Sequence, residues 1–205
     1  MKKMKVFFLM AATLGFLACG SNNTETVATE TVTTASGEYM LDSQTSVLNW
    51  KGSMVGVYAH TGTMKFTDGN ISVENGKIKS ATFTVDMKSM VTNDDDALYK
   101  MAPREKLVEH LQGDDFFSSE KFPTSTFVFE SYDGANIKGK LTIKGVTNDE
   151  TVTDVVLTEA NGSITASGKL VFDRQKYGVS YKAGMKDMVL SNDIELAISL
   201  TGKTK

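Results

Sequence analysis

Cysteine, proline, histidine and tryptophan are scarce in this chain. Its 205 residues include one cysteine, two prolines, two histidines and one tryptophan. A single thiol cannot form an intrachain disulfide, a cysteine-rich zinc site or a redox pair. The two imidazoles, His60 and His110, belong to no H-E-x-x-H spacing and have no paired cysteines beside them. The sequence therefore predicts no metal site, and a domain held together by its core and its hydrogen bonds alone.

Catalytic motifs are missing as well. The chain has no G-x-S-x-G elbow, no G-x-x-x-x-G-K-S/T phosphate loop and no G-x-G-x-x-G turn. The acidic run Asp94–Asp96 lacks the alternating spacing and the glycine of a calcium loop, so we interpret it as a solvated loop. The sequence predicts no catalytic residue and no cofactor, and we do not expect an enzyme.

The N-terminal residues have the pattern of a secretory signal. Three lysines precede an apolar stretch from Val6 to Ala18, which is shorter than the roughly 20 residues of a membrane-spanning helix. We interpret residues 1–18 as a signal peptide. The run Leu17–Gly20 resembles the bacterial lipobox, which implies that the thiol of Cys19 is acylated and begins the mature protein. The alternative is that Cys19 is an incidental small residue in a signal that is cleaved slightly later.

Residues 19–36 are expected to form a flexible tether after the lipidated cysteine. Residues 21–36 contain six threonines, no aromatic residue and no proline, a composition that buries too little apolar surface to become ordered. Without the three lysines of the signal, 19 basic side chains face 25 acidic ones, a formal charge of about −6. This acidity argues against nucleic acid or an anionic membrane surface as the partner.

Residues 37–205 are dominated by alternation of apolar and polar side chains, which is typical of half-buried strands. The alternation is longest over 164–172 and 188–200. Turn signals separate the strands at Asp68-Gly69, Asn75-Gly76, Asp133-Gly134 and Asn161-Gly162. A single substantial helix is expected over Arg104–Gln112, with Pro103 at its first position and Gly113 as its stop.

About eight antiparallel strands joined by tight turns favour a closed barrel over an open sheet with exposed edges. We therefore predict an all-β fold, an eight-stranded antiparallel β-barrel with one helical insertion. An eight-stranded barrel either fills its interior with its own side chains or holds one slender ligand, and the pattern does not separate these outcomes. Because the inward positions are overwhelmingly apolar, any guest is expected to be apolar too.

Four stretches in this domain resemble, in the same order, the motifs of the YceI-like, or polyisoprenoid-binding, proteins. They match the W-K-G and H-x-G opening, the D-F-F and F-P signature, the G-x-L-T-I-K-G-V-T segment and the D-R-x-x-Y-G element. The matching residues are Trp50–Gly52 with Gly56 and His60–Thr63, then His110–Phe127, Gly139–Thr147 and Asp173–Val179. The likeness covers about residues 39 to 202.

The resemblance implies an extended, lipocalin-like barrel with a long apolar tunnel that binds a lipid. We expect ligand-binding residues of two kinds, aromatic rings along the tunnel and polar side chains near a head group. The rings are Trp50, Phe66, Phe83, Phe127, Phe129 and Phe172, and the polar side chains are His60 and Arg174. For both polar residues a purely structural role stays open: a hydrogen-bonded histidine at one position and a salt bridge with a neighbouring carboxylate at the other.

Together these features predict an exported carrier or sensor of an isoprenoid or another long-chain amphiphile, which it would bind, store or transport. Its membrane anchor would be the lipidated Cys19 on the periplasmic side of a bacterial membrane, and Gly20 favours the outer membrane. A homodimer stays open. One alternative is a filled barrel that acts as an interaction module for a membrane partner. A lipid-modifying enzyme is a further alternative, supported only by the existence of a cavity.

Overall fold

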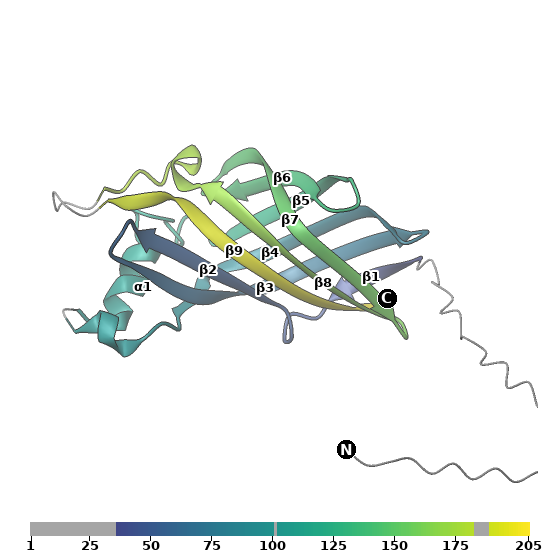
Figure 1. Cartoon of the computed structure of the whole chain (residues 1–205), viewed down its shortest axis with the longest axis horizontal. Coiled ribbons are helices and arrows are strands. Elements are labelled where there is room, and N and C mark those ends of the chain that lie inside the picture. Colours follow the sequence, from purple (N-terminus) through teal and green to yellow (C-terminus); the bar gives the residue numbers. More distant parts are fainter. Residues whose placement is uncertain (1–35, 101, 183–188) are drawn as a thin grey trace, which may run out of the picture. The chain divides into compact units, whose positions relative to one another are not determined.

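The computed structural model describes residues 36–100, 102–182 and 189–205 (Figure 1). The predicted signal peptide, Cys19 and the tether up to residue 35 lie outside the described residues. The described chain forms nine strands, one α-helix and two short 3₁₀ helices. The strands are β1 (Gly37–Leu41), β2 (Val47–Met54), β3 (Tyr58–Glu74), β4 (Lys77–Thr92), β5 (Thr124–Tyr132), β6 (Ile137–Ile143), β7 (Val146–Ala160), β8 (Ser163–Asp173) and β9 (Leu190–Thr204). The helices are η1 (Asp96–Tyr99), α1 (Arg104–Gln112) and η2 (Arg174–Tyr177).

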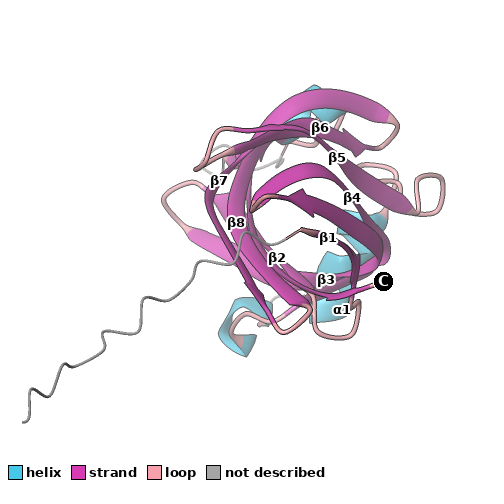
Figure 2. Ribbon diagram, turned by 90° about the vertical axis from the view of Figure 1, so that its right-hand side faces the viewer, coloured by secondary structure: helices cyan, strands magenta, loops and turns pink. Residues whose placement is uncertain are grey.

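The strands close into an antiparallel barrel, which Figure 2 shows end on. The order β2-β9-β8-β7-β6-β5-β4-β3 returns to β2, so the ring has eight positions. The remaining strand, β1, shares a position with β2, because each of them pairs with both β3 and β9. The predicted fold class is confirmed. The break of one wall strand into β1 and β2, at residues 42–46, was not predicted.

The barrel has two ends of different construction. At the terminal end, the start of β1 pairs beside the β3–β4 turn, and Thr204 N–H donates to the carbonyl of Gly162 in the β7–β8 turn at 2.9 Å. At the helix end lie the β2–β3 turn, α1, the β6–β7 turn and η2. In Figure 1 the terminal end is on the right and the helix end on the left.

The tight turns follow the predicted chemistry with one exception. Asn75 and Gly76 have φ values of 53° and 72°, which both positions of a type I′ hairpin turn require. The predicted turns at Asp133-Gly134 and Asn161-Gly162 also separate strands. The turn predicted at Asp68-Gly69 is wrong, because both residues lie inside β3, where the register with β4 shifts between Phe66 and Asp68. An Asp-Gly pair is compatible with a β-bulge as well as with a turn.

Helix α1 has the predicted bounds, although Pro103 with ψ of 152° precedes the first helical residue instead of occupying it. After the helix, Ser118 in a left-handed conformation donates its N–H to the carbonyl of Gly113 at 2.8 Å. This loop directs Phe116 and Phe117 inward, where both are buried. None of the helices that the structure describes is both long and apolar enough to cross a membrane.

The buried apolar residues form two clusters. The smaller lies toward the terminal end and consists of Tyr39, Ile71, Val73, Ile78, Ala81 and Ile164. The larger extends through the middle of the barrel to the helix end and includes Trp50, Phe66, Leu170, Phe172 and Leu196. The alternation of apolar residues therefore serves two purposes in one barrel, a packed terminal end and the wall of an interior space.

Candidate functional site: an apolar cavity with a polar end

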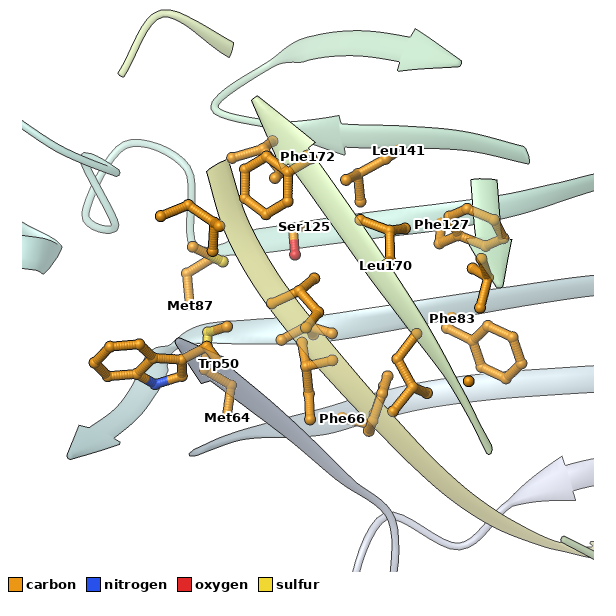
Figure 3. A pocket seen from close by; sticks show the side chains of 18 of the residues that line it. Trp50, Met64, Phe66, Phe83, Met87, Ser125, Phe127, Leu141, Leu170 and Phe172 are labelled. Atoms are coloured by element: carbon orange, nitrogen blue, oxygen red, sulfur yellow. The ribbon is translucent and has the colours of Figure 1, made fainter. Parts of the chain in front are cut away.

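The larger cluster surrounds a cavity of about 390 Å³, part of whose lining Figure 3 shows. Strands β2 to β9 all contribute to its wall, together with α1 and the loop that carries Phe116 and Phe117. Its volume lies within the range of small-molecule pockets. None of the lining residues that the structure describes is Lys, Arg, Asp or Glu. The barrel is therefore hollow, and its wall suits an apolar guest.

Seven of the eight predicted ligand-binding residues line this cavity. They are Trp50, His60, Phe66, Phe83, Phe127, Phe129 and Phe172. Figure 3 shows Trp50 at one side of the view and Phe83 and Phe127 at the other, with Phe172 between them. Inward alternation combined with the family motifs was thus sufficient to place them on one interior surface.

Arg174 does not line the cavity. Its side chain is 1 % exposed, and it donates from Nε to the carbonyl of Ser191 at 2.9 Å and from Nη1 to the carbonyl of Val179 at 2.6 Å. Burial lowers the pKa of this guanidinium, against the opposing charge of Asp173. Among the described residues no carboxylate forms an ion pair with Arg174, so the salt bridge that the sequence left open is not present there. The structure favours a structural role for Arg174 over the expected head-group contact, because it lies outside the cavity lining and both of its described hydrogen bonds go to backbone carbonyls.

The D-R-x-x-Y-G motif around Arg174 is a closing turn at the helix end. Asp173 accepts a hydrogen bond from Gln175 N–H at 2.8 Å, and Gly178 takes a left-handed φ of 71°. The buried Tyr177 donates its hydroxyl proton to Glu150 at 2.9 Å. The pKa of this phenol is raised mainly by burial and further by the hydrogen bond to the Glu150 carboxylate. The motif thus fastens β8 to the neighbouring strands and supplies no group to the cavity.

Glycines on neighbouring strands keep three of the aromatic rings flat against the wall. A Cβ placed on Gly62, which pairs with Trp50, would lie 2.6 Å from the indole. A Cβ on Gly69, which pairs with Phe83, would lie 2.7 Å from that ring. A Cβ on Gly139, which pairs with Phe129, would lie 2.4 Å from the ring of its diagonal neighbour Phe127. Because each ring covers a glycine backbone, it does not need to project toward the barrel axis.

Sequence reasoning missed these pairs. Gly62 and Gly139 stand at inward positions in line with Met64 and Leu141, where an apolar side chain would otherwise be expected, whereas Gly69 belonged to a predicted turn. That departure from alternation was a usable signal. Identifying the ring that covers each glycine required the strand register, which the sequence did not provide.

Polar lining groups gather at the helix end. Tyr58 packs edge to face on His60, with ring centroids 5.1 Å apart, and His110 packs in the same way on Tyr181 at 4.6 Å. All four line the cavity. At the opposite side apolar lining residues such as Ile71 and Ile78 continue into the smaller cluster, and the hydroxyl side chains of Ser125, Thr126 and Ser167 also line the wall. The polar aromatic side chains of the cavity thus gather at one end, which we call its polar end.

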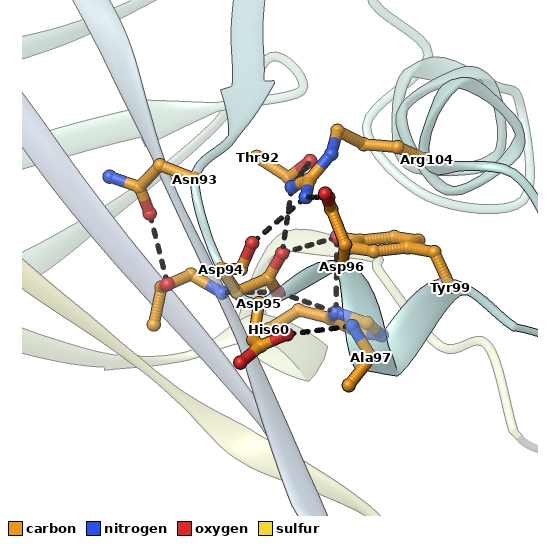
Figure 4. Close-up of polar contacts among 10 residues, drawn as sticks. His60, Thr92, Asn93, Asp94, Asp95, Asp96, Ala97, Tyr99 and Arg104 are labelled. Atoms are coloured by element: carbon orange, nitrogen blue, oxygen red, sulfur yellow. Dashed lines mark hydrogen bonds and ion pairs between the residues drawn. The ribbon is translucent and has the colours of Figure 1, made fainter.

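A hydrogen-bonded network centred on Asp94 stands behind this polar end (Figure 4). His60 Nδ1 donates to Oδ2 of Asp94 at 2.7 Å, and the Tyr99 hydroxyl donates to Oδ1 at 2.6 Å. Arg104 donates to Oδ1 of the same carboxylate at 3.0 Å and to Thr92 at 2.9 Å, and it also pairs with Asp96. The guanidinium lies 4.2 Å from the centre of the Tyr99 ring. The network fixes the orientation of the His60 ring.

Asp94 does not behave as the solvated loop residue that the sequence predicted. Its side chain is 7 % exposed, whereas that of Asp96 is 95 % exposed. Burial alone would raise the pKa of Asp94, but the hydrogen bonds from Tyr99, His60 and the Thr61 N–H outweigh it and lower that pKa. The carboxylate is therefore charged at neutral pH. In the sequence these partners are separated by up to 44 positions, from His60 to Arg104, and no spacing rule connects them.

Comparisons with known proteins agree with this geometry. Residues 39–202 match the family model described as "YceI-like domain". A UPF0312 protein of Staphylococcus aureus strain USA300 is 32% identical over 100 residues, covering 44% of this chain and 57% of its own length. A UPF0312 protein of Pseudomonas putida strain F1 is 32% identical over 123 residues, covering 56% of this chain and 59% of its own length. The matched part thus spans less than two thirds of these curated relatives.

Two solved structures share the fold. BcnA of Burkholderia cenocepacia aligns with a TM-score of 0.64 and 22% identity, covering 78% of this chain and 98% of that one. A polyisoprenoid binding domain from Saccharophagus degradans, described as implicated in plant cell wall breakdown, aligns with a TM-score of 0.58 and 16% identity, covering 82% and 98%. With the family model matching most of the domain, this chain belongs to the family of proteins with a YceI-like domain.

Proposed function

We propose that the protein binds the hydrocarbon chain of an isoprenoid-like or other long-chain amphiphile inside its barrel and stores or transports it without catalysis. The observation that carries this proposal is the apolar cavity of about 390 Å³ with polar side chains at one end. An amphiphile has the same division into an apolar chain and a polar head. The membership of the YceI-like family and the likeness to a polyisoprenoid binding domain support it.

The energetics require no positioned catalytic group. Each methylene buried from water contributes about 0.8 kcal/mol, so a chain of about 15 carbons would contribute on the order of 12 kcal/mol before the costs of association. Rings held flat by Gly62, Gly69 and Gly139 provide the wall that receives such a chain. The alternative of a filled barrel that acts only as an interaction module presupposes a solid interior, which the cavity does not support.

The proposal includes export and a membrane anchor, on the evidence of the N-terminal sequence. The charged start, the apolar stretch and the lipobox-like Leu17–Gly20 favour a lipid on Cys19, facing the periplasm. The mass of the mature N-terminal peptide from a bacterial host tests this directly. We expect acylated Cys19 and membrane retention, and release of a Cys19→Ala variant. An unmodified wild-type thiol would contradict the anchor and leave the cavity proposal untouched.

The binding proposal is tested by organic extraction of protein purified without added lipid. We expect a long-chain compound in the extract, identified by mass spectrometry, in a near-stoichiometric amount. Delipidated protein should then take up prenyl or acyl chains. A protein that yields no lipid and takes up no chain would contradict the proposed function.

A further inference from the structure

The indole N–H of Trp50 is a buried donor without an acceptor. Trp50 is 7 % exposed, and no described group accepts a hydrogen bond from its Nε1. The residue lines the cavity, and Figure 3 shows its nitrogen at one side of the view. Buried polar groups nearly always have a hydrogen-bond partner, and leaving a donor unpaired is unfavourable. A ligand oxygen in the cavity would satisfy this one.

His60 and Trp50 line the same cavity and are diagonal neighbours across β2 and β3. Trp50 pairs with Gly62 across β2 and β3, and His60 is two residues from Gly62 on the same face of β3. Such diagonal neighbours are within reach of aromatic side chains. Because the Asp94 carboxylate only accepts, the hydrogen bond at 2.7 Å places a proton on Nδ1 of His60. In the neutral ring, Nε2 on the other edge is then an acceptor.

The charge behind this pair disfavours an anionic head group. The Asp94 carboxylate contacts His60 directly, and the one guanidinium of the network, Arg104, is shared between Asp94 and Asp96. Asp95 adds a further carboxylate, which accepts from Ala97 N–H. A phosphate beside His60 would thus be repelled by nearby carboxylates, and the guanidinium of Arg104, which could offset the repulsion, is already paired with Asp94 and Asp96.

We propose that Trp50 and His60 form a head-group site for an uncharged oxygen function, an alcohol or a ketone, on a chain that lies in the cavity. Trp50 Nε1 donates to the oxygen, and an alcohol in turn donates its proton to Nε2 of His60. The hydrocarbon then extends past Met64 and Phe66 toward Phe83. This site rests on the proposed function and narrows it to neutral amphiphiles.

Trp50 is the only tryptophan in the chain, so its indole N–H gives a single cross-peak in a ¹H–¹⁵N spectrum. Delipidated protein is loaded with one of three probes of equal chain: geranylgeraniol, geranylgeranyl monophosphate, or the corresponding C20 hydrocarbon. We expect a downfield shift of the indole proton with the alcohol compared with the hydrocarbon, because only the alcohol offers an acceptor. We also expect the alcohol to bind more tightly than the phosphate.

The variant Trp50→Phe keeps a ring at the wall and removes the donor. We expect it to weaken binding of the alcohol about threefold to tenfold, the contribution of one hydrogen bond, and to change hydrocarbon binding by a smaller factor. Phe66→Leu should weaken all probes alike, since it removes only apolar contact. Asn49→Ala, on the exposed face of the same strand, should leave binding unchanged.

Three outcomes separate the possibilities. Equal indole shifts for alcohol and hydrocarbon would overturn the head-group site while leaving the lipid-binding function intact. Phosphate binding at least as tight as alcohol binding would overturn its preference for an uncharged head. Failure of all three probes to bind would overturn the proposed function itself. The indole shift is measured on the wild-type protein, so the result does not depend on the folding of a variant.

Discussion

The terminal end and the helix end of the barrel are built from the same strands with the same alternation, yet Tyr39, Val73 and Ile164 at the terminal end lie outside the lining of the cavity that the helix end borders. At the terminal end, β1 adds Tyr39, which is 3 % exposed and packs with Ile71 and Ile164. Toward the helix end, Gly62 faces Trp50 and keeps the indole against the wall. The comparison teaches that alternation determines which residues face inward. Whether the inward side chains pack against one another or leave a cavity between them depends on the placement of glycines and on the added strand β1.

The ends also differ in the interactions that hold them. Contacts among buried apolar side chains such as Ile71 and Ile164 hold the terminal end together. The helix end depends on the Asp94 network and on buried turns such as η2, whose Arg174 binds backbone carbonyls. Substitutions at the terminal end should therefore change stability through packing. Substitutions at the helix end should change stability by forcing the backbone to move or by removing a charge.

The largest effect is expected from Gly62→Ala at the helix end. The added Cβ would lie 1.8 Å from the carbonyl oxygen of Val91 and 2.6 Å from the indole of Trp50, so the backbone of β3 or β4 has to move. We expect a loss of at least about 3 kcal/mol in the free energy of unfolding, or no folded protein. Urea denaturation followed by circular dichroism measures it.

Gly52→Ala is the matched control, because the nearest atom to its added Cβ is Ile194 Cδ1 at 3.7 Å, an ordinary contact. We expect a change below about 1 kcal/mol for this substitution in a strand. Equal losses of stability for Gly62→Ala and Gly52→Ala would mean that the cost comes from replacing any glycine in the strand, and not from the close packing of Trp50 on Gly62.

The same substitution at the two regions should give unequal losses. Ile164 at the terminal end is 1 % exposed and packed, so Ile164→Ala leaves a new void and should cost about 3–4 kcal/mol. Ile198 is half-buried and already borders the cavity, so Ile198→Ala should cost about 1–2 kcal/mol. Ile198→Ala should also enlarge the space for a chain. Equal losses, measured by denaturation of ligand-free protein, would contradict the description of one region as packed and the other as hollow.

Much of the wall could be predicted because it depends on local pattern. Period-two alternation identified the inward positions of β8 and β9, and Asn-Gly pairs identified turns by their tolerance of positive φ. The Asp68-Gly69 bulge was mistaken for a turn, since the same pair suits both. The division of one strand into β1 and β2 depends on pairing with β9, some 155 residues away, as in the hydrogen bond from Ser46 Oγ to the Thr201 carbonyl.

The site was predictable in its apolar part and not in its polar part. Phe66, Phe83 and Phe172 follow from alternation, because an inward aromatic ring lines any interior space. Arg174 was placed wrongly, since a basic residue in a motif does not reveal whether its donors meet a ligand or the backbone. The Asp94 network was missed because its partners join only when β3, β4 and α1 come together.

Gly69→Ala tests the boundary between the packed and hollow regions. Phe83 packs against both apolar clusters, and a Cβ on Gly69 would lie 2.7 Å from its ring and 3.1 Å from Leu41. We expect the ring to move toward the cavity, with a loss of about 1–3 kcal/mol in stability and reduced uptake of a C20 chain. Loss of stability with unchanged uptake, measured by denaturation and by binding of geranylgeraniol, would show that the glycines do not maintain the cavity.

The smallest effect concerns charge at the helix end, in Asp94→Asn. Hydrogen bonds from Tyr99, His60 and Thr61 outweigh burial and lower the pKa of Asp94 below its ordinary 3.8. A depressed pKa means that the carboxylate stabilises the folded state above its unfolded pKa, and that this stabilisation is lost as the pH falls through the folded pKa. At pH 7 we expect Asp94→Asn to cost about 1 kcal/mol, and the gap to the wild type to narrow below about pH 4.

The control is Asp96→Asn, whose carboxylate also pairs with Arg104 but is 95 % exposed, so we expect a change below about 0.5 kcal/mol. Ile164→Ala removes no charge, so its free energy of unfolding should lie below that of the wild type by the same amount at pH 7 and at pH 3.5. Denaturation at these two pH values therefore distinguishes the ends directly. A gap between wild type and Asp94→Asn that does not narrow in acid would mean that the helix end, like the terminal end, is held by packing alone.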